Sequence, residues 1–310
     1  MSLNPLSLFR AMPGSIAQGM IWGVMALGVY ITFRLLDFAD LTVDGSIATG
    51  AAVSVMLIRA GVSPIATLPI AFLAGALAGM VTGLLNTALG IPGILASILT
   101  QISLYSINLN IMGKANQPVS VDNYPLVVSL RYVTDGSVSR LLFFLGMIVF
   151  LLALIAVMYW YFGTEQGYAI RATGCNGNMA RAQGINTNFI KVLALMISNG
   201  LVGLCGALYG QFQGASDVNM GRGAIVIGLA AVIIGEVLFG KFASKRKLAF
   251  AFTLASVILG AVIYYMVYQF VLWLKMPSED MKLFSAIVVA IFLAIPYLKE
   301  KRTLRKGASK

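Results

Sequence analysis

The chain has 310 residues, of which 59% are hydrophobic and only 11% are charged. Soluble domains carry about 25% charged residues, so a chain this apolar is expected to be a polytopic membrane protein. Its net charge of +11 does not indicate nucleic-acid binding, because the basic residues gather at the ends of apolar segments and in the tail at 299–310.

Apolar runs long enough to cross a hydrocarbon core of about 30 Å recur along the chain. The first covers 11–33, and the residues before it lack the basic stretch of a cleavable signal peptide, so this span is expected to stay in place. Further spans are expected at 62–89, 91–112, 141–162, 192–212, 223–240, 248–274 and 283–298. With a broken second helix the total is about nine, in a range of roughly eight to ten. The sequence therefore predicts an all-α polytopic membrane protein with one transmembrane domain over 1–310.

The second helix is expected to be broken. Asp37, Asp40 and Asp44 follow the first span, and the apolar run after them covers only 47–58. Apolar runs of about 10–14 residues are typical of partial or re-entrant segments, so the polar break at 40–46 should face protein or water rather than lipid. Asp40 and Asp44 are candidates to line a solute pathway, although Asp is also a good helix N-cap, which favours capping for Asp44.

A short internal repeat is present. Residues 40–46 (DLTVDGS) lead into 50–53 (GAAV), and residues 217–223 (DVNMGRG) lead into a similar run that begins at Gly228. An inverted repeat of a transporter would give this pattern, and so would chance between segments of similar apolar composition. The expected topology places the first motif near the inner side and the second near the outer side.

Orientation follows from the basic residues, which are enriched in cytoplasmic loops. The loop at 241–247, the tail at 299–310 and the segment that holds Arg171, Arg181 and Lys191 should all be cytoplasmic, which leaves the N-terminus outside. Asp217 then lies at the outer mouth, either where a binding protein docks or in a solvated loop.

Glu236 lies within an apolar run, where charged side chains usually face a cavity or a partner. It is a gate candidate. The alternative, which its place near the end of the run favours, is a helix-end carboxylate paired with Lys241 or Lys245.

Two glycine stripes have the spacing that lets helix backbones approach closely, and we interpret both as packing surfaces rather than functional sites. They consist of Gly75, Gly79 and Gly83, and of Gly206, Gly210 and Gly214.

One long polar segment, 164–184 (TEQGYAIRATGCNGNMARAQG), separates two of the expected spans. Its small residues and arginines would suit close contact with a partner in the aqueous phase. An ordinary cytoplasmic loop with arginines that follow the positive-inside rule is the alternative. The candidate contact residues are Glu165, Arg171, Ala172, Thr173, Gly174, Asn176, Met179, Ala180 and Gly184.

Three stretches, 167–176 (GYAIRATGCN), 179–186 (MARAQGIN) and 203–211 (GLCGALYGQ), resemble the permeases of ABC importers in the branched-chain amino acid and ribose class. The resemblance extends from Gly19 to about Pro296. Residues 40–46 are similar to the Asp-Leu-Ser-Val-Gly-Ser pattern of that family, with Asp44 as an extra residue. This variant resembles the tryptophan/tyrosine-type subgroup and departs from the Asn-Phe-Ala pattern of the branched-chain subgroup.

The resemblance implies a set of partners. Segment 164–184 would be the coupling helix that sits in a cleft of a cytoplasmic ATPase dimer, and ATP with Mg²⁺ would bind that ATPase. A substrate-binding protein would deliver a small solute, an amino acid of aromatic type, to the outer face. A second copy of the chain would complete a homodimer embedded in lipid of the bacterial cytoplasmic (inner) membrane.

Other functions fit the sequence less well. Residues 235–242 (GEVLFGKF) imitate a P-loop, but Phe242 replaces the Ser/Thr that binds Mg²⁺ and a spanning helix precedes it, so no nucleotide site or cofactor is expected in this chain. An enzyme is disfavoured by the absence of histidine and the wide separation of the carboxylates. Cys175 and Cys205 form neither a disulfide framework nor a metal-ligand cluster. An ion-gradient-driven secondary transporter stays open, since a broken helix and an inverted repeat suit it equally.

Overall fold

The structure, a computed structural model, describes residues 5–134, 136–243 and 248–274, with the single residues 283, 287, 290 and 294 beyond them. Most of this part of the chain is helical. The elements in order are α1 (Pro5–Tyr30), η1 (Ile31–Leu35), α2 (Val43–Arg59), α3 (Pro64–Thr87), α4 (Gly93–Met112), β1 (Asn116–Pro118), α5 (Leu130–Thr134), α6 (Ser137–Tyr161), α7 (Glu165–Cys175), α8 (Gly177–Ala182), α9 (Thr187–Gln213), β2 (Ala215–Asp217), α10 (Ala224–Ala243) and α11 (Ala249–Trp273).

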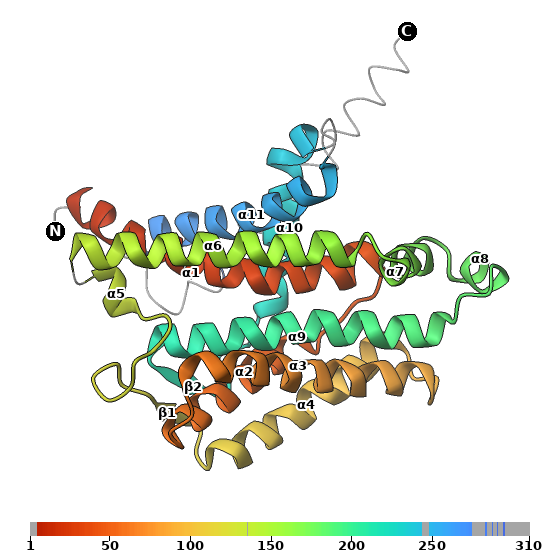
Figure 1. The fold of residues 1–310 in the computed structure, drawn as a ribbon, viewed down its shortest axis with the longest axis horizontal. Coiled ribbons are helices and arrows are strands. Elements are labelled where there is room, and N and C mark those ends of the chain that lie inside the picture. The colour runs from red at the N-terminus through yellow and green to blue at the C-terminus, as the bar shows by residue number, and fades with distance from the viewer. Residues whose placement is uncertain are drawn as a thin grey trace, which may run out of the picture.

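The long helices α1, α6, α9 and α11 run alongside one another in Figure 1, with α7 and α8 at one end of the bundle. Strands β1 and β2 lie toward the other end, the end at which α1 begins. They form a two-stranded antiparallel sheet in which Gln117 lies opposite Ser216. This sheet, which the sequence patterns did not predict, ties the long loop after α4 to the end of α9.

Helix α9 is the centre of the bundle. It packs against α1, α2 and α3, while α10 and α11 pack against α1 and against each other. Most of α9 and α1 is buried, whereas α4 and α6 are exposed along most of their length. Because α1 and α9 are buried among the other helices over most of their length, they form the core of the described bundle.

Glycines allow α9 to approach α2 and α3 at backbone distance. A Cβ atom on Gly75 would lie 2.1 Å from the carbonyl oxygen of Asn199, and one on Gly206 would lie 2.0 Å from that of Ile47. Real Cβ atoms are not found this close to a carbonyl oxygen, so only glycine fits at these contacts. The predicted packing role of the two stripes is confirmed at these positions, and Gly214 serves differently, by ending α9 with a φ of 74°.

Six described helices are long and apolar enough to cross a membrane: Ser7–Leu35, which joins α1 and η1, and α3, α4, α6, α9 and α11. These helices are compatible with the predicted all-α polytopic membrane protein. Helix α2 has only 17 residues, and α10 contributes a shorter apolar stretch, Ala224–Gly240. The expected span at 283–298 lies almost entirely outside the described residues, so the total of nine stays a prediction.

The expected break in the second helix, at 40–46, lies earlier than predicted, because α2 is continuous from Val43 and the non-helical stretch covers 36–42. Helix α1 passes into the π-helical turn η1, and the chain at 36–42 then leads back into the bundle as α2. Asp40 and Thr42 in this connection are buried, as is most of α2. Asp37 and Ala39 in the same connection are exposed, so the other helices cover only part of this non-helical backbone.

Candidate functional sites

The segment expected to contact a partner forms two helices rather than one. Asn176 between α7 and α8 has an extended backbone, and its side-chain oxygen accepts hydrogen bonds from the backbone N–H groups of Asn178 (3.1 Å) and Met179 (3.0 Å). Asn is a favoured N-cap because it satisfies backbone donors at the start of a helix. Asn176 therefore ends α7 and begins α8, which sets the angle between them.

Helix α7 rests directly on the end of the first helix. A Cβ atom on Gly174 would lie 2.0 Å from the carbonyl oxygen of Leu35 and 2.9 Å from the Cα atom of Leu36. No side chain lies between the two backbones at this point, which Gly makes possible. Helix α7 is thereby seated against η1, at the beginning of the 36–42 connection.

Arg171 faces the protein interior, not the solvent. Its guanidinium carbon lies 4.1 Å from the ring centroid of Phe250 in α11, 5.8 Å from that of Phe162 and 5.9 Å from that of Tyr168. Cations over aromatic faces are stabilised by the ring quadrupole. The expectation that Arg171 reaches outward to acidic groups of a partner is therefore replaced by an internal role, in which it fastens α7 to α6 and α11.

The nine candidate contact residues separate into two groups. Glu165, Ala172, Asn176, Met179 and Gly184 are exposed, whereas Thr173 and Ala180 are buried and Arg171 and Gly174 pack inward. Tyr168 and Met179 are 61% and 63% exposed and are the largest apolar side chains on this surface. Helix periodicity explains the division, because a single face of α7 and α8 can turn outward.

Asp44 joins α2 to α10. Its two carboxylate oxygens accept hydrogen bonds from the backbone N–H groups of Gly223 (3.0 Å) and Ile225 (2.9 Å). Asp44 was predicted to cap the second helix. It does act as a helix cap, but it lies in the first turn of α2 and caps α10 instead. A carboxylate at a helix N-terminus is stabilised by the free N–H groups and by the helix dipole.

The two repeated motifs thus meet, and the prediction that they lie near opposite sides was wrong. From this junction α2 runs to Arg59, whose side chain donates to Gln117 in β1. Helix α10 runs the other way, to Glu236, which pairs with Arg34 at the end of η1. Two short helices that start together and run in opposite directions have the arrangement that an inverted repeat would give, although the repeat itself stays a prediction.

Asp40 belongs to a buried polar network. Its carboxylate accepts from the Thr42 N–H (2.9 Å) and from the Asn199 side-chain amide (2.7 Å), and Ser46 donates to the Asn199 oxygen (2.7 Å). Buried polar groups need such partners to offset their desolvation. Asp40 is satisfied within this network and holds the connection against α9, away from the cavity described next.

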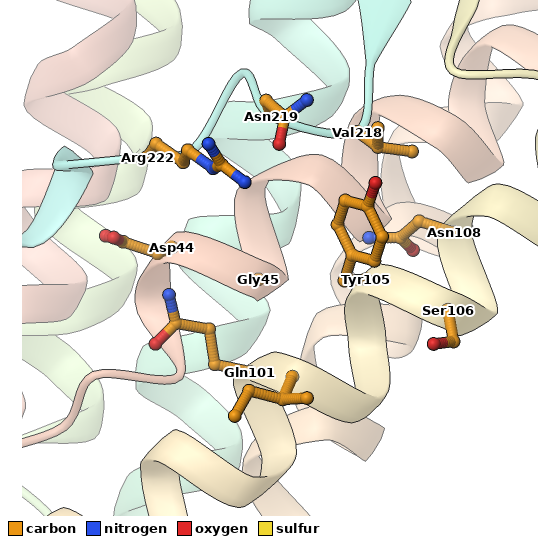
Figure 2. Close-up of a pocket in the computed structure, with 10 residues that line it drawn as sticks. Asp44, Gly45, Gln101, Tyr105, Ser106, Asn108, Val218, Asn219 and Arg222 are labelled. Carbon is orange, nitrogen blue, oxygen red and sulfur yellow. The ribbon is translucent and has the colours of Figure 1, made fainter.

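A cavity of about 260 Å³ lies beside the junction. Its walls come from the start of α2, from one face of α4 and from the turn between β2 and α10. Figure 2 shows Arg222 and Asn219 above the space, Tyr105 and Asn108 to one side and Gln101 below it. The lining residues are Asp44, Gly45, Gln101, Ile102, Tyr105, Ser106, Asn108, Val218, Asn219 and Arg222.

Two other predicted acidic candidates lie away from this cavity. Glu236 pairs with Arg34, and the side chains of the expected partners Lys241 and Lys245 are outside the described residues. Asp217 pairs with Asn116 in the sheet, and its carboxylate accepts from the Asn219 N–H at 2.7 Å. Of the four acidic pathway candidates, only Asp44 lines the cavity.

A family profile described as the permease component of the branched-chain amino acid transport system matches residues 12–296. The chain belongs to this permease family. The permeases of this family are membrane subunits of ABC transporters, so the resemblance predicted from Gly19 to about Pro296 is confirmed.

Several known permeases are similar to this one. A tyrosine transport system permease protein of Clostridioides difficile (strain R20291) is 40% identical over 279 residues, which cover 90% of this permease and 89% of the relative. An autoinducer 2 import system permease protein of Yersinia pseudotuberculosis (serotype O:3) is 28% identical over 259 residues, or 82% and 68% of the two chains. The inner membrane ABC transporter permease protein YjfF of Escherichia coli K12 is 27% identical over 218 residues, or 70% and 64%. No solved structure matches the permease.

Sequence reasoning missed the polar face of α4. Gln101, Tyr105 and Asn108 are spaced at i, i+4 and i+7, which places them on one side of a helix. That periodicity within an apolar span was a usable signal. In the sequence, by contrast, nothing distinguishes Arg222 from an ordinary loop residue. Only the fold, which places the β2–α10 turn beside α4, shows that it lines the cavity.

Proposed function

We propose that this permease imports an aromatic amino acid, driven by a separate ATPase dimer that grips the exposed face of α7 and α8. The observation that carries the proposal is the seating of α7 on the first helix through Gly174, which joins the exposed surface that holds Tyr168 and Met179 to the connection at 36–42. The 40% identity to a tyrosine transport permease supports the solute class.

In this proposal the α7–α8 end lies in the bacterial cytoplasm and the β1–β2 end faces a substrate-binding protein. The relative in Escherichia coli is named as an inner membrane protein, which supports placement in the bacterial inner membrane. Movement of the ATPase on ATP binding would displace α7 and, through Leu35, the connection that begins α2. Alternating access would follow from the motion of α2 and α10 about their common junction.

A second copy of the permease would cover α4 in this proposal. Ser103, Tyr105, Ser106 and Asn110 are exposed on α4, although the helix has the length of a span. Polar groups facing hydrocarbon are costly, so this face should meet protein or a water-filled path. A homodimer built on α4 would place the two cavities beside the shared interface.

Affinity purification of the tagged permease from native membranes tests the coupling surface. Met179→Asp combined with Tyr168→Asp should reduce the co-purified ATPase by about tenfold or more, because exposed apolar anchors dominate such interfaces. Val138→Asp is the matched control, since Val138 is 79% exposed at the other end of the bundle. Equal ATPase recovery with all three proteins would contradict the docking role of α7 and α8.

Uptake by reconstituted vesicles separates this proposal from the secondary transporter. Uptake of tyrosine should require ATP, the ATPase and the binding protein, and it should persist when the ion gradient is collapsed. Uptake that follows the ion gradient without ATP would favour the alternative. For that alternative Glu236 was the carboxylate in question, and the structure pairs it with Arg34.

A further inference from the structure

The cavity beside the junction contains a buried polar side chain without a partner. Asn108 is 0% exposed, and neither its amide nitrogen nor its amide oxygen has a hydrogen-bond partner. A buried polar group left unpaired costs about 1–3 kcal/mol, so such groups point to a missing ligand or water. Figure 2 shows the Asn108 amide behind the Tyr105 ring, at the edge of the open space.

The same cavity holds a positive charge that the neighbouring carboxylate does not neutralise. Asp44 is engaged by the backbone of α10, and among the described residues no carboxylate lies within ion-pair distance of Arg222. Figure 2 shows the Arg222 guanidinium directed over the space, while the Asp44 carboxylate points away from it. A planar guanidinium is well suited to hold a carboxylate through two parallel hydrogen bonds.

The remaining walls mix polar side chains (Gln101, Ser106 and Asn219) with aromatic and apolar ones. Tyr105 and Ile102 line the cavity from α4, and Val218 lines it from the β2–α10 turn. An aromatic wall favours stacking with an apolar or aromatic body. The cavity volume of about 260 Å³ is slightly below the roughly 300–1,000 Å³ of pockets for drug-sized ligands, so it suits a smaller solute.

We propose that this cavity is a solute-binding station within the permease itself, selective for an α-amino acid. Arg222 holds the carboxylate, the Asn108 amide binds the polar head beside it, and Tyr105 packs against the side chain. This assignment rests on the proposed import of an amino acid. It specifies where the solute binds within the membrane subunit during transport. It is separate from the site on the binding protein.

Equilibrium binding of radiolabelled L-tyrosine to the permease–ATPase complex in nanodiscs, with no binding protein present, tests the station. Arg222→Gln should weaken binding by about tenfold or more, because it removes a charge-assisted hydrogen bond. Arg131→Gln is the matched control, since Arg131 is an exposed partner of Asp122 and does not line the cavity. Tyramine, which lacks the carboxylate, should compete poorly with tyrosine for the native complex.

Asn108→Leu distinguishes a ligand-binding role from a structural one. The substitution removes an unpaired buried amide, so the thermal stability of the solute-free complex should stay equal or rise, while tyrosine binding falls several-fold. A structural asparagine would show the reverse pattern, with lost stability and unchanged affinity.

Native affinity in Arg222→Gln, or equal competition by tyramine and tyrosine, would overturn the station. A different result would contradict the proposed function. If the native complex with its binding protein shows no ATP-dependent uptake, import itself is wrong. If uptake is intact and Arg222→Gln transports and binds as the native complex does, only the station is wrong.

Discussion

Helices α4 and α6 both lie at the margin of the bundle and both expose most of their residues, yet their outer faces differ. From 141 to 157 every residue of α6 is apolar or glycine, and its outward side chains are mainly Leu, Ile and Val. The outward face of α4 mixes Leu and Ile with Ser103, Tyr105, Ser106 and Asn110. The exposed residues of the isolated chain therefore form two kinds of surface. The outward face of α6 is uniformly apolar and suits contact with hydrocarbon, whereas the outward face of α4 carries polar groups.

The physical difference is the cost of an unpaired polar group in lipid. Hydroxyl and amide groups that face hydrocarbon lose water without a replacement partner. Helix interfaces in membranes instead use small and polar residues for close packing and interhelical hydrogen bonds. By this criterion we expect α6 to contact lipid and α4 to contact protein or water, and three experiments test this expectation.

The largest effect is expected from placing a charge on each face. Ile148→Asp in α6 should lower the amount of folded, membrane-inserted permease severely, because an Asp at the centre of a span costs about 2.5–3.5 kcal/mol. Ser103→Asp in α4 should lower it far less. Fluorescence-detected size-exclusion chromatography of solubilised membranes measures both, and equal losses would refute the assignment of the two faces.

An intermediate effect is expected in cross-linking. In a Cys175→Ser, Cys205→Ala background, Ser106→Cys on α4 should give disulfide-linked dimers in membranes, since a two-fold interface brings equivalent residues together. Ala153→Cys on the exposed face of α6 should stay monomeric under the same oxidation. Dimers from the α6 variant alone would move the interface to that helix.

The smallest effect is expected from conservative changes. Leu142→Ile on the outer face of α6 should shift the free energy of unfolding by no more than about 0.5 kcal/mol, as is usual for exposed positions. Tyr105→Leu on α4 should also change stability little but should weaken tyrosine binding a few-fold, because it removes an aromatic wall. Thermal melts and binding isotherms of the two variants provide the comparison.

Much of the fold could be predicted from the sequence because apolar length and glycine spacing are local signals. The ends of the expected spans at 91–112 and 248–274 fall within about two residues of α4 and α11, an ordinary uncertainty for helix ends. The polar residues after the first span predicted an interruption for the same reason, but they were placed at 40–46 within the second helix, whereas the structure has the interruption at 36–42, before α2.

The candidate sites were harder to predict because they depend on which face of each helix turns inward. Arg171 was expected to point outward, but packing of α7 on α11 places it over Phe250. The pairing of Asp44 with the start of α10 joins positions far apart in the chain, and no local pattern encodes it. The β1–β2 sheet is too short for its strands to show an alternating pattern.

The contact of Gly174 with Leu35 has a mechanical consequence. Two backbones touch there with no side chain between them that could rotate away and absorb a displacement. A displacement of α7 would therefore be transmitted directly to the end of the first helix. If the ATPase moves α7 as proposed, the stiffness of this contact would set how much of that movement reaches the connection at 36–42.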